Sequence, residues 1–358
     1  MKKMSRSCCC KFGVFLAASM VLMSSVKVDG DPIVPALCIF GDSVVDVGNN
    51  NKLLTLIKAD FPPYGRDFAA HKPTGRFCNG KLATDFIAEY LGFSSYPPAY
   101  LSKEAKGVDL INGANFASAG SGYYDQTAHL YGALSLPKQL EYYRDWQRQV
   151  VDFVGQDKAD TIISQGIHVV STGSSDYIQN YYINPLVRSL SHDQFSDILI
   201  KSFSCFIQNL YNLGARRVGV TSLPPIGCLP AAITIFGQGS DHCVTRLNQD
   251  AVAFNEKLHA ASRRVKAELP GLKLVIFDVY NPLLDMISDP ADDGFAESRK
   301  ACCGTGLIET SFLCNKLSLG TCRNATEYVF WDGFHPSEAA NEELANKLLE
   351  QGYQLIFN

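Results

Sequence analysis

Short apolar runs alternate along this chain with longer segments of helical periodicity. Four runs rich in β-branched and aromatic residues predict buried strands, and a weaker run predicts a fifth. The four lie at residues 36–40, 167–172, 217–221 and 272–280, and the weaker one at 108–112. Three longer segments repeat apolar residues every three or four positions, which predicts helices at 191–213, 243–269 and about 336–351. This alternation predicts an α/β fold with a mostly parallel sheet covered by helices.

The first thirty residues have a different pattern. Four basic residues precede an apolar stretch over residues 12–26, and Val28-Asp29-Gly30 follows as a cleavage site. This order is typical of a secretory signal peptide. The stretch is too short to span a bilayer comfortably, which disfavours a membrane anchor. We expect residues 1–30 to be removed and residues 31–358 to be secreted as a single domain without an integral membrane segment.

Composition and charge narrow the possible partners. Hydrophobic residues make up 46% of the chain and charged residues 19%, which allows a large core. The signal segment holds five basic residues and one acidic residue, so its removal takes the formal charge from −4 to −8. A chain this acidic has no general attraction for phosphate backbones, and we expect no nucleic-acid partner.

Cysteine usage also fits an oxidising destination, where disulfides are the default. Nine of the 12 cysteines lie beyond the signal segment, and six of these fall in loop-like sequence: Cys228, Cys243, Cys302, Cys303, Cys314 and Cys322. The first two flank one polar excursion and could close it, whereas the pairing of the last four stays open. A zinc site made from these four is disfavoured, because their spacing is not that of paired C-x-x-C knuckles. Cys38 and Cys205 lie in apolar runs, which predicts buried thiols.

The first predicted strand ends at Gly41-Asp42-Ser43. A serine at this place is a candidate nucleophile, because open α/β sheets bind ligands beyond the carboxyl ends of their strands, although Gly-Asp-Ser is also an ordinary turn. Of the seven histidines, only His335 has a carboxylate at short fixed range on an irregular loop, namely Asp332. If Asp332 accepts a hydrogen bond from Nδ1, then Nε2 is free to act as a base. The motif Gly-x-Ser-x-Gly does not occur, which argues against the α/β-hydrolase fold.

Four blocks follow one another along the chain: FGDSVVDVGNN at 40–50, GANFASAGSG at 113–122, GSSDY at 173–177 and FWDGFHP at 330–336. With residues 75–77 and 301–304, they resemble the plant GDSL-type esterases and lipases of the SGNH hydrolase superfamily. The resemblance runs from about Pro35 to the C-terminus. It implies a flavodoxin-like three-layer α/β/α sandwich with a central, mostly parallel sheet.

The resemblance also implies roles for individual residues. Ser43 matches the nucleophile, and its backbone N–H matches one oxyanion donor. The N–H of Gly120 matches a second donor, while Asp332 and His335 match the acid and base of the triad. The third block of the family usually reads Gly-x-Asn-Asp, with the Asn amide as a third donor. Here that position is Ser175. Its side chain is shorter than Asn and has no amide to donate.

The sequence therefore predicts a secreted serine ester hydrolase, carboxylesterase-like or lipase-like, that acts through an acyl-enzyme without a metal or organic cofactor. We expect a monomer in the apoplast or cell wall, acting on a small-molecule or lipid ester and glycosylated at the sequon of Asn324. Two alternatives stay open. One is an acyltransferase with the same triad, and the other is a weakly active ester- or glycan-binding protein, motivated by Ser175.

Overall fold

Four parallel strands form the centre of the fold in a computed structural model that describes residues 31–357. They lie side by side in sequence order: β1 (Leu37–Gly41), β2 (Ile167–Ser171), β3 (Arg217–Thr221) and β4 (Lys273–Phe277). All four overlap predicted strands, although the strand predicted at 272–280 ends already at Phe277. The prediction of a mostly parallel sheet is confirmed. The predicted signal peptide lies outside the described residues.

The prediction of a fifth strand at 108–112 is wrong. Gly107–Leu110 forms a 3-10 turn in which the side chain of Val108 is 71% exposed. The chain joins β1 only after this turn, where the Leu37 N–H donates to the carbonyl of Asn112 at 2.9 Å. Gly113 allows the chain to approach β1 this closely, because a Cβ there would lie 2.1 Å from the Leu37 carbonyl oxygen. Apolar composition alone did not reveal this offset.

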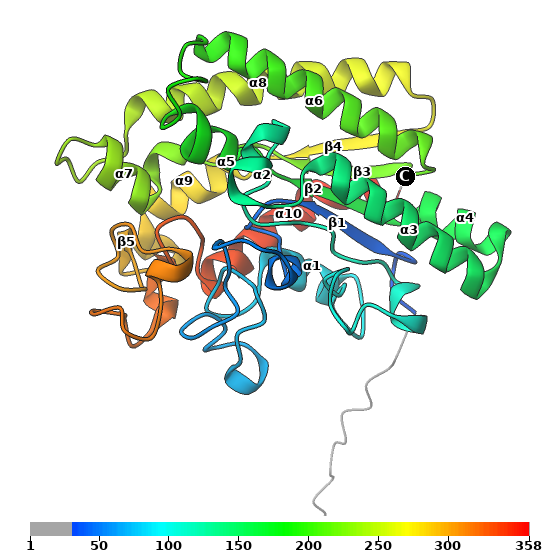
Figure 1. Cartoon of the computed structure of the whole chain (residues 1–358), viewed down its shortest axis with the longest axis horizontal. Helices are drawn as coiled ribbons and strands as arrows, with labels where there is room; N and C mark the ends of the chain where they lie inside the picture. The colour runs from blue at the N-terminus through cyan, green and yellow to red at the C-terminus, as the bar shows by residue number, and fades with distance from the viewer. Residues whose placement is uncertain (1–30, 358) are drawn as a thin grey trace, which may run out of the picture. The chain divides into compact units, whose positions relative to one another are not determined.

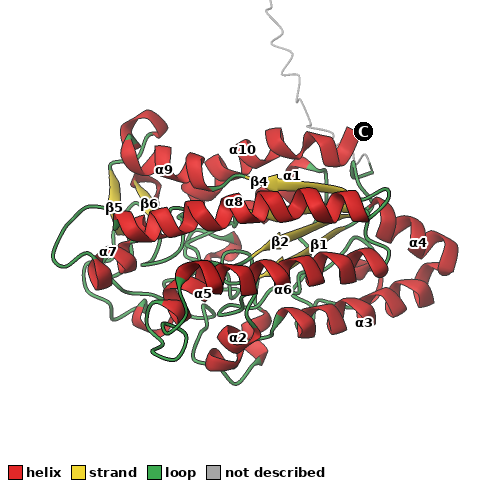
Figure 2. Ribbon diagram, turned by 90° about the horizontal axis from the view of Figure 1, so that it is seen from above, coloured by secondary structure: helices red, strands yellow, loops and turns green. Residues whose placement is uncertain are grey.

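Helices cover both faces of the sheet, which confirms the three-layer α/β/α arrangement (Figure 1 and Figure 2). One face, called the α6 face, is covered by α3 (Leu136–Val154), α6 (His192–Asn212) and α8 (Thr245–Glu268). The other, called the α10 face, is covered by α1 (Ala83–Tyr90) and α10 (Glu338–Phe357). The remaining elements are α2 (Asp125–Tyr131), α4 (Gln156–Gln165), α5 (Ser174–Asp176), α7 (Pro230–Phe236), α9 (Tyr280–Ser288), β5 (Glu297–Ala301) and β6 (Tyr328–Phe330).

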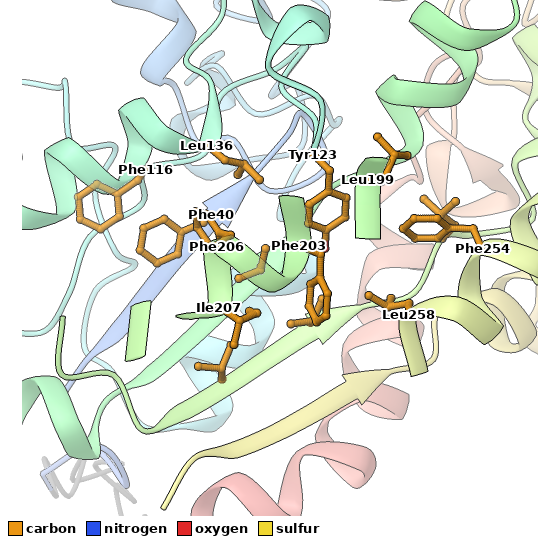
Figure 3. Packing of buried hydrophobic residues seen from close by; sticks show 14 of the residues in the cluster. Phe40, Phe116, Tyr123, Leu136, Leu199, Phe203, Phe206, Ile207, Phe254 and Leu258 are labelled. Atoms are coloured by element: carbon orange, nitrogen blue, oxygen red, sulfur yellow. The ribbon is translucent and has the colours of Figure 1, made fainter. Parts of the chain in front are cut away.

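Large aromatic side chains fill the core on the α6 face (Figure 3). The ring of Phe40 on β1 lies 5.6 Å from that of Phe206 on α6 and 5.1 Å from that of Phe116. Ser191 caps α6 by accepting from the Gln194 N–H, which fixes the start of the helix. Five residues of the predicted stripe are buried against the core: Phe195, Leu199, Phe203, Phe206 and Leu210.

Three disulfides join the six cysteines of the loop-like segments: Cys228–Cys243, Cys302–Cys322 and Cys303–Cys314. Cys38 is buried as expected, but Cys205 is exposed. That expectation was wrong because the neighbours of Cys205 on α6 take the core positions, and helical spacing turns residue 205 outward. Across residues 31–357, no three His, Cys, Asp or Glu side chains are grouped to hold a metal ion. No helix in this part of the chain has the length and apolar character needed to cross a membrane.

Candidate active site

A tight turn at the carboxyl end of β1 presents Ser43. Gly41 has a φ of 141°, and a Cβ there would lie 1.9 Å from the Ser171 carbonyl oxygen, so only glycine fits. The side chain of Gln139 holds the same residue from α3. Its Oε1 accepts from the Gly41 N–H and its Nε2 donates to the Gly41 carbonyl, both at 2.9 Å. These two hydrogen bonds hold the start of the turn, two residues before Ser43.

Ser43, His335 and Asp332 form one chain of hydrogen bonds. Nε2 of His335 lies 2.7 Å from Oγ of Ser43, although 292 residues separate them in sequence. Nδ1 of His335 lies 2.7 Å from Oδ1 of Asp332. The same Oδ1 accepts from the backbone N–H groups of Phe334 and His335, at 2.9 and 3.0 Å. The carboxylate therefore folds back on its own loop as the Asp-x-x-His spacing predicts, and all three side chains are buried.

Tyr64 is a site residue that the sequence did not reveal. Its hydroxyl donates to Oδ2 of Asp332 at 2.6 Å and accepts from the Ser311 N–H at 2.7 Å. Thr310 donates to the same Oδ2 at 3.1 Å. Burial, and then the charge of Asp332, raise the pKa of Tyr64 well above its usual range, so the hydroxyl stays a donor. Because 268 residues separate Tyr64 from Asp332, no local pattern connects them.

Side chains of the first sequence block hold the segment that leads to Gly120. Oδ2 of Asp46 accepts from the Ala119 N–H at 3.1 Å, and Asn50 donates to the Ala119 carbonyl at 2.9 Å. Asn49 donates to the Ala117 carbonyl at 2.8 Å. Burial raises the pKa of Asp46 to about 6. The first and second blocks are thus parts of one hydrogen-bonded unit.

Gly120 and Ser43 both present backbone N–H groups that donate no hydrogen bond within residues 31–357. Gly120 has a φ of 85°, which explains why glycine stands there. Ser43 lines the cleft that leads to the nucleophile. Among residues 31–357, Gly120 does not belong to the lining of that cleft. An oxyanion hole requires unpaired N–H groups, and Ser43 supplies one at the nucleophile itself.

Ser175 lies on α5, after β2, and lines the same cleft as Ser43. Its hydroxyl has no hydrogen-bond partner among the described residues. The next residue, Asp176, fixes the loop after Gly120 by accepting from the Tyr123 N–H at 2.7 Å and the Thr127 hydroxyl at 2.6 Å. Burial raises the pKa of Asp176 to about 7. The third block therefore joins the second, with Ser175 facing the cleft.

A cleft gives access to Ser43 and His335. Its polar lining lies close to the strand ends and consists mainly of hydroxyl groups. These come from Ser43, Ser171, Thr172, Ser174, Ser175, Thr221 and Ser222. Such a cleft, polar around one buried nucleophile and apolar elsewhere, is typical of a small-molecule site.

The sequon residue Asn324 lies six residues before the fourth block, in an exposed loop. Its Oδ1 accepts from the Thr326 N–H at 3.2 Å and from the Thr326 hydroxyl at 2.8 Å. The side chain is open to solvent, as a glycosylation site requires. Its modification stays a prediction.

Known proteins with similar sequences match most of the length of this chain. Residues 37–348 match the family described as GDSL-like Lipase/Acylhydrolase. Two Arabidopsis thaliana proteins, each named a GDSL esterase/lipase, are 63% identical to this chain. The first match covers 94% of both chains. The second covers 91% of this chain and 93% of the relative. The Arabidopsis GDSL esterase/lipase APG is 54% identical, over 97% of this chain and 99% of its own. The solved structure of YXIM_BACsu from Bacillus subtilis has 12% identity to this chain and a TM-score of 0.33, over 89% of this chain and 56% of that chain.

Proposed function

Since this chain belongs to the GDSL-like lipase/acylhydrolase family and is an ester hydrolase, we propose that it cleaves esters through Ser43, His335 and Asp332 by way of an acyl-enzyme. The proposal rests on a continuous series of hydrogen bonds from Ser43 Oγ through both ring nitrogens of His335 to Asp332. Each of the two hydrogen bonds is 2.7 Å long.

Acylation begins when Nε2 of His335 takes the proton of Ser43 and Oγ attacks the ester carbonyl carbon. Asp332 accepts from Nδ1–H and stabilises the imidazolium that forms. Tyr64 and Thr310 hold the other carboxylate oxygen, so Asp332 keeps its orientation while charge moves on the ring. His335 then protonates the leaving alcohol as the carbonyl–alcohol bond breaks. Water repeats these steps on the acyl-enzyme and regenerates Ser43.

The negative charge that develops on the carbonyl oxygen needs donors. We assign this role to the N–H groups of Ser43 and Gly120, with the hydroxyl of Ser175 as a weaker third donor. The unpaired state of both N–H groups among the described residues supports the first two assignments. The Ser175 hydroxyl is supported by its place in the cleft and its lack of another partner there.

We also propose that the protein acts outside the cell, as a monomer of one domain, after removal of residues 1–30. The three disulfides support this location, since they are typical of oxidising compartments. The exposed side chain of Asn324 is consistent with it as well.

The test of the mechanism compares the wild type with Ser43→Ala on p-nitrophenyl acetate and butyrate, with fluorophosphonate labelling in parallel. We expect Ser43→Ala to lose label and at least about 10³-fold in kcat/KM. Ser174→Ala is the matched control, because Ser174 lines the same cleft and should leave labelling intact. Equal rates for the wild type and Ser43→Ala would remove the proposal. Product analysis with an added acceptor alcohol separates hydrolysis from acyl transfer.

The role of Ser175 has its own test. Ser175→Asn restores the amide that the family carries at this position, so we expect kcat to rise at least tenfold; loss of one such donor costs about 10²–10³. An unchanged or lower kcat in a folded, fluorophosphonate-reactive variant would show that the hydroxyl, or another donor, already suffices.

A further inference from the structure

The cleft that reaches Ser43 does not end there but continues into the α10 face, between the sheet and helices α1 and α10. We call this continuation the α10 slot. Its walls are mostly apolar and come from the sheet, from both helices and from the turn after Ser43: Val45, Ile87, Val169, Phe277, Leu344 and Leu348. Thr84 of α1 and Asn341 of α10 are the polar exceptions. The polar lining near the strand ends thus gives way to aliphatic and aromatic side chains. Of the described residues that line the whole cleft, only Asp42 and His335 are acidic or basic.

The direction of the slot follows from the helix that covers it. α10 begins three residues after His335 and packs on β3 and β4, running back toward the amino ends of the strands (Figure 2). Asn341 and Leu348 both line the cleft, and their separation of seven positions corresponds to about 10 Å along a helix. On the sheet side, Ser171 lines the cleft at the end of β2 and Val169 lines it about 7 Å deeper.

Two glycines hold one wall of the slot in place. A Cβ on Gly219 of β3 would lie 2.1 Å from Cε2 of Phe277, and a Cβ on Gly352 of α10 would lie 3.3 Å from Cε1 of the same ring. The ring of Phe277 therefore occupies the space that side chains at these two positions would fill. It is fixed between β3 and α10 as a wall of the slot.

We propose that the α10 slot binds the acyl chain of a medium-chain ester, an inference that rests on the proposed function of Ser43. An alkyl chain gains from burial against aliphatic walls, whereas a sugar or a charged acid would lose hydration there without new partners. An extended alkyl chain advances about 1.25 Å per carbon, so the slot accepts about eight carbons. The cleft continues in a second direction past Ser174, Gln179 and Pro224, which leaves that side for the alcohol.

The experiment compares kcat/KM on p-nitrophenyl acetate, butyrate, octanoate and dodecanoate for the wild type, Leu348→Phe and Leu348→Ala. We expect octanoate to exceed acetate in the wild type, since each buried methylene contributes about fourfold. Leu348→Phe fills the deep end, so the ratio of octanoate to acetate turnover should fall at least tenfold. Leu348→Ala lengthens the slot and should raise dodecanoate relative to octanoate.

Leu349→Phe is the matched control, because it places the same side chain one residue along α10, at a position that does not line the cleft. Its chain-length profile should follow that of the wild type. Parallel profiles for the wild type and both Leu348 variants would overturn the proposal. So would a loss in Leu348→Phe that affects octyl acetate but spares ethyl octanoate, since the slot would then hold the alcohol. Failure of the proposed function looks different: acetate turnover would not exceed that of Ser43→Ala.

Discussion

The two faces of the central sheet are packed in different ways. On the α6 face, aromatic side chains such as Phe203 and Phe254 are fully buried and fill the space under α6 and α8 (Figure 3). On the α10 face, a smaller cluster holds α1 and α10, and the α10 slot enters beside it from Ser43. The α6 face thus serves mainly to stabilise the fold, while the α10 face is less densely packed and leaves room for a ligand.

Alternation along the strands produces this difference. In β2, Val170 faces the α6 core and Val169 faces α10. In β3, Val218 and Val220 belong to the α6 core, while Gly219 between them presents no side chain to α10. A strand that alternates valine with glycine builds a dense core on one side and leaves space on the other.

The largest effect should come from a cavity in the α6 face. Phe203→Ala removes a fully buried ring, and we expect it to cost about 3–5 kcal/mol of unfolding free energy. Leu348→Ala, on the α10 face, should cost about 2 kcal/mol, because one side of Leu348 already borders the slot. Denaturant unfolding with disulfides intact measures both. Equal costs would mean that the two faces are packed alike.

Tyr64→Phe tests the hydrogen bonding that holds Asp332 of the triad, not the packing of either face of the sheet. Removing its hydroxyl takes one donor from Oδ2 of Asp332, and a hydrogen bond to a charged group is worth about 1.5–3 kcal/mol. We expect kcat on p-nitrophenyl acetate to fall at least about tenfold with the octanoate-to-acetate ratio unchanged. Tyr123→Phe is the control, since its buried hydroxyl has no partner among the described residues. A drop in Tyr123→Phe of similar size would contradict a specific role for Tyr64.

Gly219→Ala should disturb the α10 face alone. The new Cβ would meet the ring of Phe277, which must move, and overpacking of this kind costs about 1–3 kcal/mol. A displaced ring narrows the slot, so octanoate turnover should fall more than acetate turnover. If the two substrates lose equally, then Phe277 is not a wall of the slot.

Features that depend on short stretches of sequence were predictable. Four strands and the long helices follow from local periodicity, and the Asp332–His335 pair follows from three-residue spacing that lets the carboxylate fold back on its loop. Ser43 was identified because it directly follows a strand. These inferences needed only residues that are close together in the chain.

Features that depend on the fold as a whole were not predictable. Tyr64 reaches Asp332 from another loop, and the α10 slot exists only because α10 returns to the sheet beside Ser43. The strand expected at 108–112 failed for a related reason, since pairing with β1 is decided by where Gly113 allows close approach. Cys205 is a different case, because the helical spacing of Phe203, Phe206 and Leu210 already places residue 205 off the buried stripe.

The smallest effect concerns a histidine in the α6 face. His168 on β2 is buried, its Nε2 lies 2.7 Å from the Tyr143 hydroxyl, and burial lowers its pKa from 6.5 to about 4. Between these pH values the unfolded chain binds a proton that the folded protein does not. The contribution of His168 to stability is therefore complete above pH 6.5 and is lost as pH falls toward 4, by about 1.4 kcal/mol per pH unit.

Unfolding free energies at pH 7 and 5.5 should differ less in His168→Gln than in the wild type, whereas Leu348→Ala on the α10 face should keep the wild-type difference. Identical slopes for His168→Gln and the wild type would mean that water reaches His168, and that the α6 face is less tightly closed than its aromatic packing implies.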